Sequence, residues 1–362
     1  MTSLDIAHRR LSNQQISSAA FKKPSETVGW LGAVQAQDYL GSLWAVGLRT
    51  QSAVEEEIEQ AIADKAIVRS WPLRGTLHYV AAVDARWMLK LGAPRIIARA
   101  ASRYRQLELD EATFAKSNRV LTRALQGGEQ LTRAELAAAL NRAGISTDGQ
   151  RLIHILSRSA LDGLTCYAAR RGKQFTFALL EEWVAAARTL ERDEALAELA
   201  KRYFTSRGPA TLQDFVWWSG LTTADARAGL EMAKPHLAQE TIKGQTYWLS
   251  YATPAAKETL QTAYLLPAYD EYTVAYRDRS AVLNSCYAKR ADSGNGIFSP
   301  VMVLAGQVVG TWKRTLKKGS VIITPNPFTR LKQAEKHAFT RAARQYGAFL
   351  GLQAVLAEVT LE

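Results

Sequence analysis

The feature that most constrains the fold is a unit of two helices and a β-hairpin that the sequence repeats. In its clearest copy, Thr132 and Glu135 have the spacing of a capping box, in which each side chain bonds a free N–H group at a helix start. This helix is predicted to end at Gly144, and a second helix over 149–161 carries apolar residues on one face. Two predicted strands, 164–168 and 175–179, then flank a basic turn with Arg170, Arg171 and Lys173. This order predicts a winged helix.

The same plan returns on both sides of this copy. Downstream, Thr211 and Thr222 cap two predicted helices separated by Gly220, and the strands 237–242 and 245–249 flank the two-residue turn Lys243-Gly244. Upstream, in looser form, predicted helices over 6–20, 25–33 and 54–63 precede strands over 67–71 and 76–81. Three such units in tandem are better explained as one array than as coincidence.

The pattern changes beyond residue 262. Short strands are predicted at 264–266, 301–304, 307–312 and 321–324, followed by a helix over 331–346 and a strand over 352–359. They indicate a small antiparallel sheet or barrel. We therefore predict an α+β protein with winged-helix units over 1–110, 111–195 and 196–262 and a β-barrel-like domain over 263–362.

Two glutamines flank Ala36 in an apolar stretch of the first unit. Gln35 and Gln37 are two residues apart, so they do not share a stripe of a helix, but they converge if the backbone turns or is extended there. A carboxamide can both donate to and accept from one water molecule. The alternative is structural: one glutamine caps or bridges helices and the other is solvated.

The charge balance points to a polyanionic partner. Lys plus Arg number 46 against 34 acidic residues, giving a net charge of +12 and a pI near 9.7. Nucleic acid is the first expectation and an anionic membrane surface the second, while a generically basic protein stays open. No secretory signal and no apolar run of about 20 residues is found, so a cytoplasmic, nucleoid-associated protein is expected.

Several common sites are absent from the sequence. There is no phosphate-binding glycine loop, no GxSxG motif, no HExxH motif and no paired metal spacing among the five histidines. The two cysteines, Cys166 and Cys286, exclude a disulfide scaffold and CxxC zinc fingers. No metal or cofactor is therefore expected.

Basic residues gather in three places that suit phosphate contacts. Arg95, Arg99 and Arg103 are spaced by four, which places them on one side of a helix predicted to begin at Pro94. The other two places are the turn with Arg170, Arg171 and Lys173 and the pair Lys313-Arg314. In each case the alternative is a solvated, solubilising surface.

Other polar and aromatic residues have two interpretations. Asp270 lies beside Glu271 between aromatic residues, which suits a catalytic carboxylate, but pairing with Arg277 or Arg279 is the structural alternative. The predicted interpretation of Trp183, Trp217 and Trp218 is core packing.

Segments along nearly the whole chain resemble the AlkZ-like winged-helix DNA glycosylases of bacteria. They are residues 32–37 (GAVQAQ), 71–78 (WPLRGTLH), 207–211 (RGPAT), 217–221 (WWSGL), 266–270 (LPAYD) and 309–314 (VGTWKR). The resemblance implies three winged-helix units and a β-barrel around a concave basic channel for duplex DNA. It also implies that Gln35 and Gln37 match the family's glutamine–apolar–glutamine motif, of which a sister group carries an aspartate at the second polar position.

The activity implied is monofunctional: hydrolysis of the N-glycosidic bond of purines alkylated at N7 or N3, including bulky or interstrand-crosslinked ones. Gln35 and Gln37 are then the catalytic candidates, with Asp38, His78 and Asp270 as accessory candidates. Arg74 joins the DNA-binding candidates, since the resemblance places Arg74 and His78 near the lesion; core packing is the alternative for His78. The expected partner is double-stranded DNA with alkylation damage, bound by a monomer without a cofactor.

A non-catalytic DNA-binding protein is the alternative function. Three winged helices on a basic chain suit a transcriptional regulator without any chemistry, although regulators commonly dimerise on paired half-sites. A third interpretation is a member that kept the fold and lost the activity.

Overall fold

Three sheets organise the chain in the computed structural model, which describes residues 2–184, 186–242, 244–251, 262–292 and 298–358. The largest sheet has six strands in the order β1-β3-β2-β5-β6-β4 and is antiparallel throughout. Its strands are β1 (Val34–Gln35), β2 (Ile67–Leu73), β3 (Thr76–Ala81), β4 (Leu131–Thr132), β5 (Thr165–Tyr167) and β6 (Thr176–Leu179). The pairing of Arg69 with Tyr167 joins the first two predicted hairpins in one sheet.

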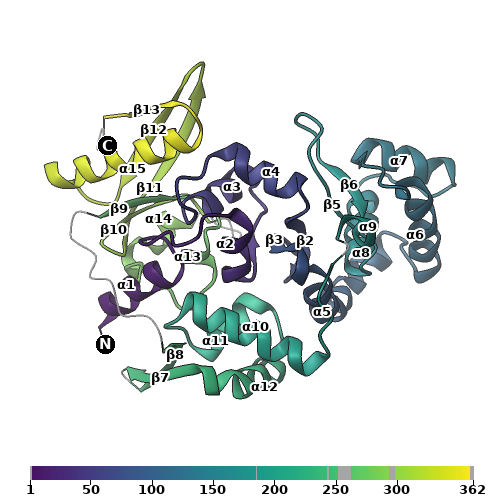
Figure 1. Cartoon of the computed structure of the whole chain (residues 1–362), viewed down its shortest axis with the longest axis horizontal. Coiled ribbons are helices and arrows are strands. Elements are labelled where there is room, and N and C mark those ends of the chain that lie inside the picture. The colour runs from purple at the N-terminus through teal and green to yellow at the C-terminus, as the bar shows by residue number, and fades with distance from the viewer. Residues whose placement is uncertain (1, 185, 243, 252–261, 293–297, 359–362) are drawn as a thin grey trace.

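Helices lie on either side of this sheet (Figure 1). Those before β2 are α1 (Ser3–Asn13), α2 (Pro24–Leu31), α3 (Tyr39–Gly47) and α4 (Glu55–Ala63). Those between β3 and the third unit are η1 (Ala82–Asp84), α5 (Ala85–Gln106), α6 (Glu111–Leu125), α7 (Arg133–Arg142), α8 (Arg151–Leu161) and α9 (Leu180–Trp183).

The third unit and the C-terminal part lie against the first unit (Figure 1). The third unit has α10 (Arg192–Arg207), α11 (Leu212–Ser219), α12 (Thr223–Ala233), η2 (Lys234–His236) and the two-stranded sheet β7 (Leu237–Ile242) and β8 (Gln245–Ser250). The C-terminal part has β9 (Ala263–Leu266), α13 (Glu271–Val274), η3 (Ser285–Tyr287), α14 (Ala288–Ala291), β10 (Val301–Leu304), β11 (Gln307–Lys317), β12 (Ser320–Pro327), α15 (Gln333–Phe349) and β13 (Gln353–Leu356).

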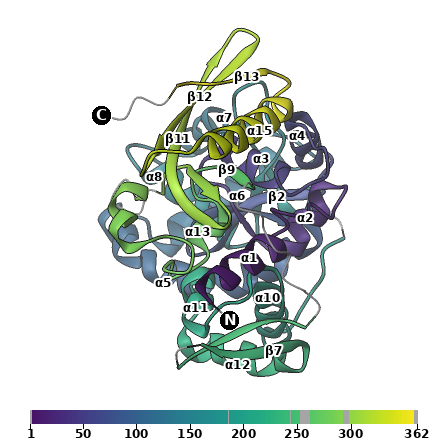
Figure 2. The ribbon, with the colours of Figure 1, turned by 90° about the vertical axis from the view of Figure 1, so that its left-hand side faces the viewer.

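The C-terminal sheet is an open, curled half-barrel. Its five strands follow the order β13-β12-β11-β10-β9, and the pairing is antiparallel except between β12 and β13. The β11–β12 hairpin projects from the body of the molecule (Figure 2). The fold is thus a mixed α+β architecture, as expected, with half of a barrel at its C-terminus.

The hairpin β2–β3 lies where three apolar cores meet. Tyr79 belongs to a core shared by the N-terminal helices and the C-terminal sheet, and Val80 to a core with α10, α11 and α12. Trp71 belongs to the core of the second unit. Because one hairpin packs against all three parts, a site beside it draws its residues from the whole chain.

Most predicted strands and caps are confirmed, while two details of the helices are wrong. Thr132, Thr211 and Thr222 cap helices as predicted. Pro94 is not the first residue of its helix: α5 begins nine residues earlier, because Trp87, Met88 and neighbouring residues bury a face that offsets the hydrogen bond lost at proline. The first predicted helix ends at Asn13 rather than residue 20. The predicted turn at Lys243 lies outside the described residues.

Three of the longer helices, α3, α6 and α10, were not predicted from the sequence, nor were the four-residue helices α9, α13 and α14. In α3, the residues from Gly41 to Gly47 are all buried, so no amphipathic period marks the helix. Among the described residues, no helix combines the length and the apolarity needed to cross a bilayer.

Candidate active site

The two glutamines lie in the short connection between α2 and α3, with Gln35 at the end of β1 and Gln37 in a bend before α3. Helix α2 ends at Gly32, whose φ of +73° is a conformation that favours glycine, and β1 follows at once. Gln35 pairs across the sheet with His78 of β3. The chain bends at Gln37, directly after the strand that holds Gln35, and such a turn is the local condition under which the sequence allows the two side chains to converge.

The hydrogen bonds of the two carboxamides fix their orientation. The Oε1 atom of Gln35 accepts the N–H of Gln37 at 3.0 Å, and the Oε1 atom of Gln37 accepts the N–H of Leu77 at 3.4 Å. These two bonds assign the oxygen and the nitrogen of each amide. Gln35 is 7% exposed, whereas Gln37 is exposed. Each oxygen keeps a second lone pair for a water molecule.

A buried ion pair holds the backbone of Gln35. Glu271 accepts the Gln35 N–H through Oε1 at 2.9 Å, and its Oε2 accepts from Arg207 Nε at 3.0 Å, Arg207 Nη2 at 2.7 Å and Trp218 Nε1 at 2.9 Å. Arg207 also donates to the carbonyl groups of Leu31 and Ala33. Both members of the pair are fully buried, so this contact ties β1 to α10, α11 and α13.

A second arginine holds the other side of the motif. Arg69 of β2, 5% exposed, donates through Nε and Nη2 to the Ala36 carbonyl at 3.2 and 2.9 Å. Its guanidinium carbon lies 5.4, 4.7 and 4.5 Å from the ring centroids of Tyr39, Tyr167 and Phe175. The cation–π contacts fix the guanidinium in place, and with it the peptide between the two glutamines.

Burial is the main reason that His78 is neutral. Burial and then the nearby Arg74 guanidinium lower the pKa of His78 to about 4. Its Nδ1 lies 2.9 Å from the Thr76 carbonyl, so Nδ1 carries the proton and Nε2 is a buried acceptor without a partner in the described chain. Burial acts to raise the pKa of Glu271, but Arg207 and the hydrogen bonds hold it below the usual value.

The accessory candidates lie in different environments. His78 is fully buried, so it does not reach the surface in this conformation. Asp38 is half-buried at the start of α3, where its side chain makes no capping hydrogen bond. Asp270 is 1% exposed and forms a two-fold ion pair with Arg49, at 2.9 and 2.7 Å, while accepting the Tyr272 N–H. The predicted pairing of Asp270 with Arg277 or Arg279 is therefore wrong.

The basic candidates divide into exposed side chains and side chains that pair with another group. Arg95 and Arg99 are exposed along α5, as are Lys173 and Lys313, while Arg103 is exposed but donates to the side chains of Gln106 and Gln150, each at 2.8 Å. The paired ones are Arg170 with Glu59 at 2.7 Å, Arg171 with Glu135 at 2.8 Å and Arg314 with the Tyr346 hydroxyl at 2.6 Å. Arg74 is half-buried against Gly220 at the end of α11, and its Nε has no partner in the described chain.

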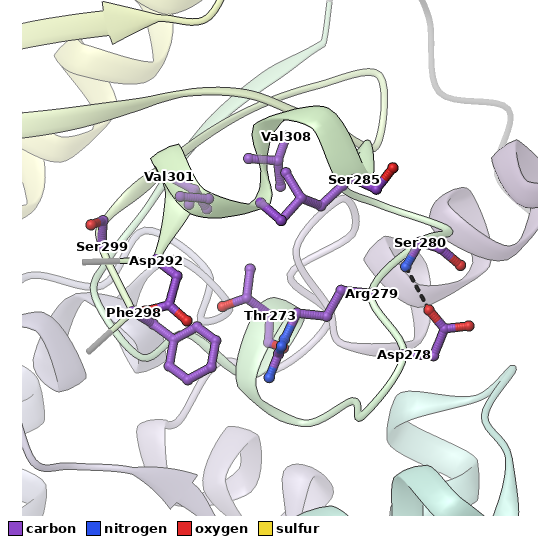
Figure 3. Close-up of a pocket in the computed structure, with 13 residues that line it drawn as sticks. Thr273, Asp278, Arg279, Ser280, Ser285, Asp292, Phe298, Ser299, Val301 and Val308 are labelled. Atoms are coloured by element: carbon purple, nitrogen blue, oxygen red, sulfur yellow. Dashed lines mark hydrogen bonds between the residues drawn. The ribbon is translucent and has the colours of Figure 1, made fainter. Parts of the chain in front are cut away.

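A cavity of about 240 Å³ lies beside Thr273 of α13 (Figure 3). Thr273, Arg279 and Phe298 line it, with the Arg279 guanidinium carbon 4.5 Å from the Phe298 ring centroid. In the described ranges, no group of three or more His, Cys, Asp or Glu residues is placed to hold a metal ion.

Sequence reasoning missed Arg69, Arg207 and Glu271, which hold the motif. Each left a weak signal. Arg69 is the one charged residue of the strand 67–73, and Glu271 is the second acid beside Asp270. Arg207 belongs to one of the segments that carry the resemblance, but nothing in that segment indicates its partner 64 residues away.

Comparison with known proteins places the chain among relatives of similar length. It is 27% identical over 354 residues to the interstrand DNA cross-link repair glycosylase of Streptomyces sahachiroi, covering 91% of this chain and 92% of that protein. The solved structure of Streptomyces sahachiroi DNA glycosylase AlkZ matches 99% of this chain and 100% of its own, with a TM-score of 0.80 at 23% identity, so the two share a fold.

The match to a family model settles the assignment. The model of the family described as DNA glycosylase AlkZ-like matches residues 28–349, which include the glutamine motif and the residues that hold it. The chain belongs to the AlkZ-like DNA glycosylase family.

Proposed function

We propose that this protein is a monofunctional DNA glycosylase that hydrolyses the N-glycosidic bond of purines alkylated at N7 or N3, interstrand crosslinks included. Membership of the AlkZ-like family and the function named for the Streptomyces relative support this class of reaction. The observation that carries the proposal is the backbone of Gln35–Gln37, held rigidly while the Gln37 side chain is exposed.

The chemistry suits two neutral side chains. A purine alkylated at N7 or N3 is cationic, so it leaves the sugar without protonation by a strong acid. What the protein must supply is a water molecule placed against the developing oxocarbenium ion. Carboxamides are poor bases near neutral pH, so the acceleration comes from positioning and from oriented dipoles. The free lone pairs on the Oε1 atoms of Gln35 and Gln37 are the proposed acceptors for that water.

The contacts of the motif also favour hydrolysis over a lyase reaction. A lyase needs an amine nucleophile, usually lysine, that attacks the sugar carbon. The described groups bonded to the motif from outside come from Arg69, Leu77 and Glu271, and none is a lysine. Water is therefore the proposed nucleophile, and an intact abasic site the proposed product.

DNA binding is proposed for the exposed arginines of α5 and for the exposed Lys173 and Lys313. Three units of two helices followed by a hairpin, which we interpret as winged helices, would then surround a basic channel for duplex DNA together with the half-barrel. We further propose that the protein acts as a monomer, because a repair enzyme on a channel needs no paired half-sites.

The test is base release from DNA containing N7-methylguanine, followed by alkali and detection of strand breaks. Wild-type protein is expected to release the base, and Gln37→Ala and Gln35→Ala are expected to lower the rate constant by about 10- to 100-fold while DNA affinity is kept. Gln333→Ala, at an exposed glutamine of α15, is the matched control. Binding to one promoter sequence without any base release would favour a regulator instead.

A further inference from the structure

Helix α11 presents one tryptophan to solvent. Trp217 is 43% exposed, while Phe215 and Trp218 of the same helix are fully buried. The core packing predicted for Trp217 therefore applies to only part of its side chain. The indole Nε1 donates to the Val274 carbonyl at 3.0 Å. This hydrogen bond fixes the ring edge, and the remaining ring surface faces solvent in a defined orientation.

Arginines from two other elements surround this indole. The Arg279 guanidinium carbon lies 5.8 Å from the Trp217 ring centroid. One helical turn before Trp217, the exposed Gln213 accepts from Arg277 Nη1 at 3.2 Å. At the end of the helix, Arg74 lies so close to Gly220 that a Cβ there would come within 2.9 Å of Arg74 Cγ. The exposed ring is therefore flanked by positive charge.

The helix that carries the indole is linked to the glutamine motif through α13. Its chain neighbour Trp218 donates to Glu271, and Glu271 accepts the Gln35 N–H. The carbonyl that holds Trp217 belongs to the same short helix as Glu271. Arg74 lies in the turn between β2 and β3, and β3 pairs with the strand that carries Gln35. A ligand on the indole would thus contact elements that also hold the glutamine motif.

We propose that Trp217 is the platform on which a base displaced from the DNA duplex stacks, while Arg74, Arg277 and Arg279 neutralise the phosphates around that base. This inference rests on the proposed function. A flat, rigid aromatic face offers stacking to any base, and arginines beside it suit a phosphate backbone. An apolar protein partner would need a wider apolar patch than one ring among cations. Nucleic acid is therefore the occupant that the surface fits.

The experiment compares binding to two duplexes that differ by one extrahelical adenine. Wild-type protein is expected to bind the bulged duplex more tightly than the continuous one. Trp217→Gln keeps a donor for the Val274 carbonyl but removes the ring, so its affinity for the bulged duplex should fall by about 5- to 150-fold, with little change for the continuous duplex. Trp217→Phe keeps a ring without the donor and should retain most of the preference. Leu4→Ala, which alters an apolar side chain 42% exposed, is the control.

The outcomes separate this inference from the proposed function. Equal binding of both duplexes by the wild-type protein overturns the platform, and so does a preference that survives in Trp217→Gln. Loss of the preference in Trp217→Phe but not in Trp217→Gln would also overturn it, since the hydrogen bond rather than the ring would then matter. Base release from alkylated DNA is measured separately: a protein that prefers the bulge but releases no base contradicts the glycosylase proposal alone.

Discussion

Replacing Glu271 with glutamine removes the charge that holds the glutamine motif. The substitution is isosteric, but it places an NH₂ group among groups that donate to Glu271: Gln35 N–H, two nitrogens of Arg207 and the Trp218 indole. It also leaves Arg207 fully buried without a counter-charge. Breaking such a pair costs about 3–5 kcal/mol. Because Arg207 keeps its bonds to the Leu31 and Ala33 carbonyls, we expect the free energy of unfolding to fall by about 3 kcal/mol, at the low end of this range.

Thermal unfolding and single-turnover base release measure the two consequences. An unfolding entropy of about 2.1 cal/mol/K per residue gives about 0.8 kcal/mol/K for 362 residues, so 3 kcal/mol corresponds to a fall of about 4 °C in Tm. Displacement of the Gln35 backbone by a fraction of an ångström should lower the rate constant for base release by about 10- to 100-fold. DNA affinity should change little, because Glu271 is fully buried.

The double variant Arg207→Met with Glu271→Leu is the control. It removes both charges together, so its loss of stability should be smaller than the sum of the single losses. A Glu271→Gln protein with the wild-type Tm and the wild-type rate constant would refute the assigned role of the ion pair. A lower Tm with an unchanged rate constant would show that the pair stabilises the fold without positioning Gln35.

Three further outcomes are expected. Folding lowers the pKa of His78 from 6.5 to about 4, so between these pH values the unfolded chain binds a proton that the folded chain does not. The free energy of unfolding should therefore fall by about 3 kcal/mol as the pH is lowered from 7 to 4. Urea unfolding should show this pH dependence in the wild-type protein and not in His78→Leu. Asp270→Ala leaves Arg49 buried without its partner and should lower stability by about 3–5 kcal/mol, measured by urea unfolding; a change below 1 kcal/mol would contradict the assigned pairing. Changing Arg95, Arg99 and Arg103 together to glutamine should reduce the slope of log affinity against log salt by about 3, and an unchanged slope would exclude α5 from the DNA contacts.

Local structure followed from the sequence where local chemistry decides it. The capping threonines at 132, 211 and 222 and the hairpin strands are specified by residues within a few positions of one another. Helix α3 was not predicted, because it is buried on every side and its sequence therefore has no amphipathic period. The predicted helix start at Pro94 was wrong, because the sequence does not distinguish a proline at a helix start from a proline inside a long, well-packed helix.

Long-range partners could not be predicted in the same way. Asp270 had two arginines nearby in sequence, Arg277 and Arg279, yet it pairs with Arg49, which is 221 residues away. Nothing in composition or spacing selects among the many arginines of a basic chain. Which arginine becomes buried depends on how α3 and α13 pack, and that is a property of the assembled cores.

The buried charges around the motif have a physical explanation in the weakness of its chemical groups. Carboxamides neither take nor give a proton readily, so their contribution to a rate depends on how accurately they hold a water molecule. A loop held only by its own hydrogen bonds would let both side chains move. Here the peptides on either side of Gln35 are bound by the Glu271–Arg207 pair and by Arg69. The residues that bind them come from the first unit, the third unit and the C-terminal part, so the rigidity of the proposed site requires the complete fold.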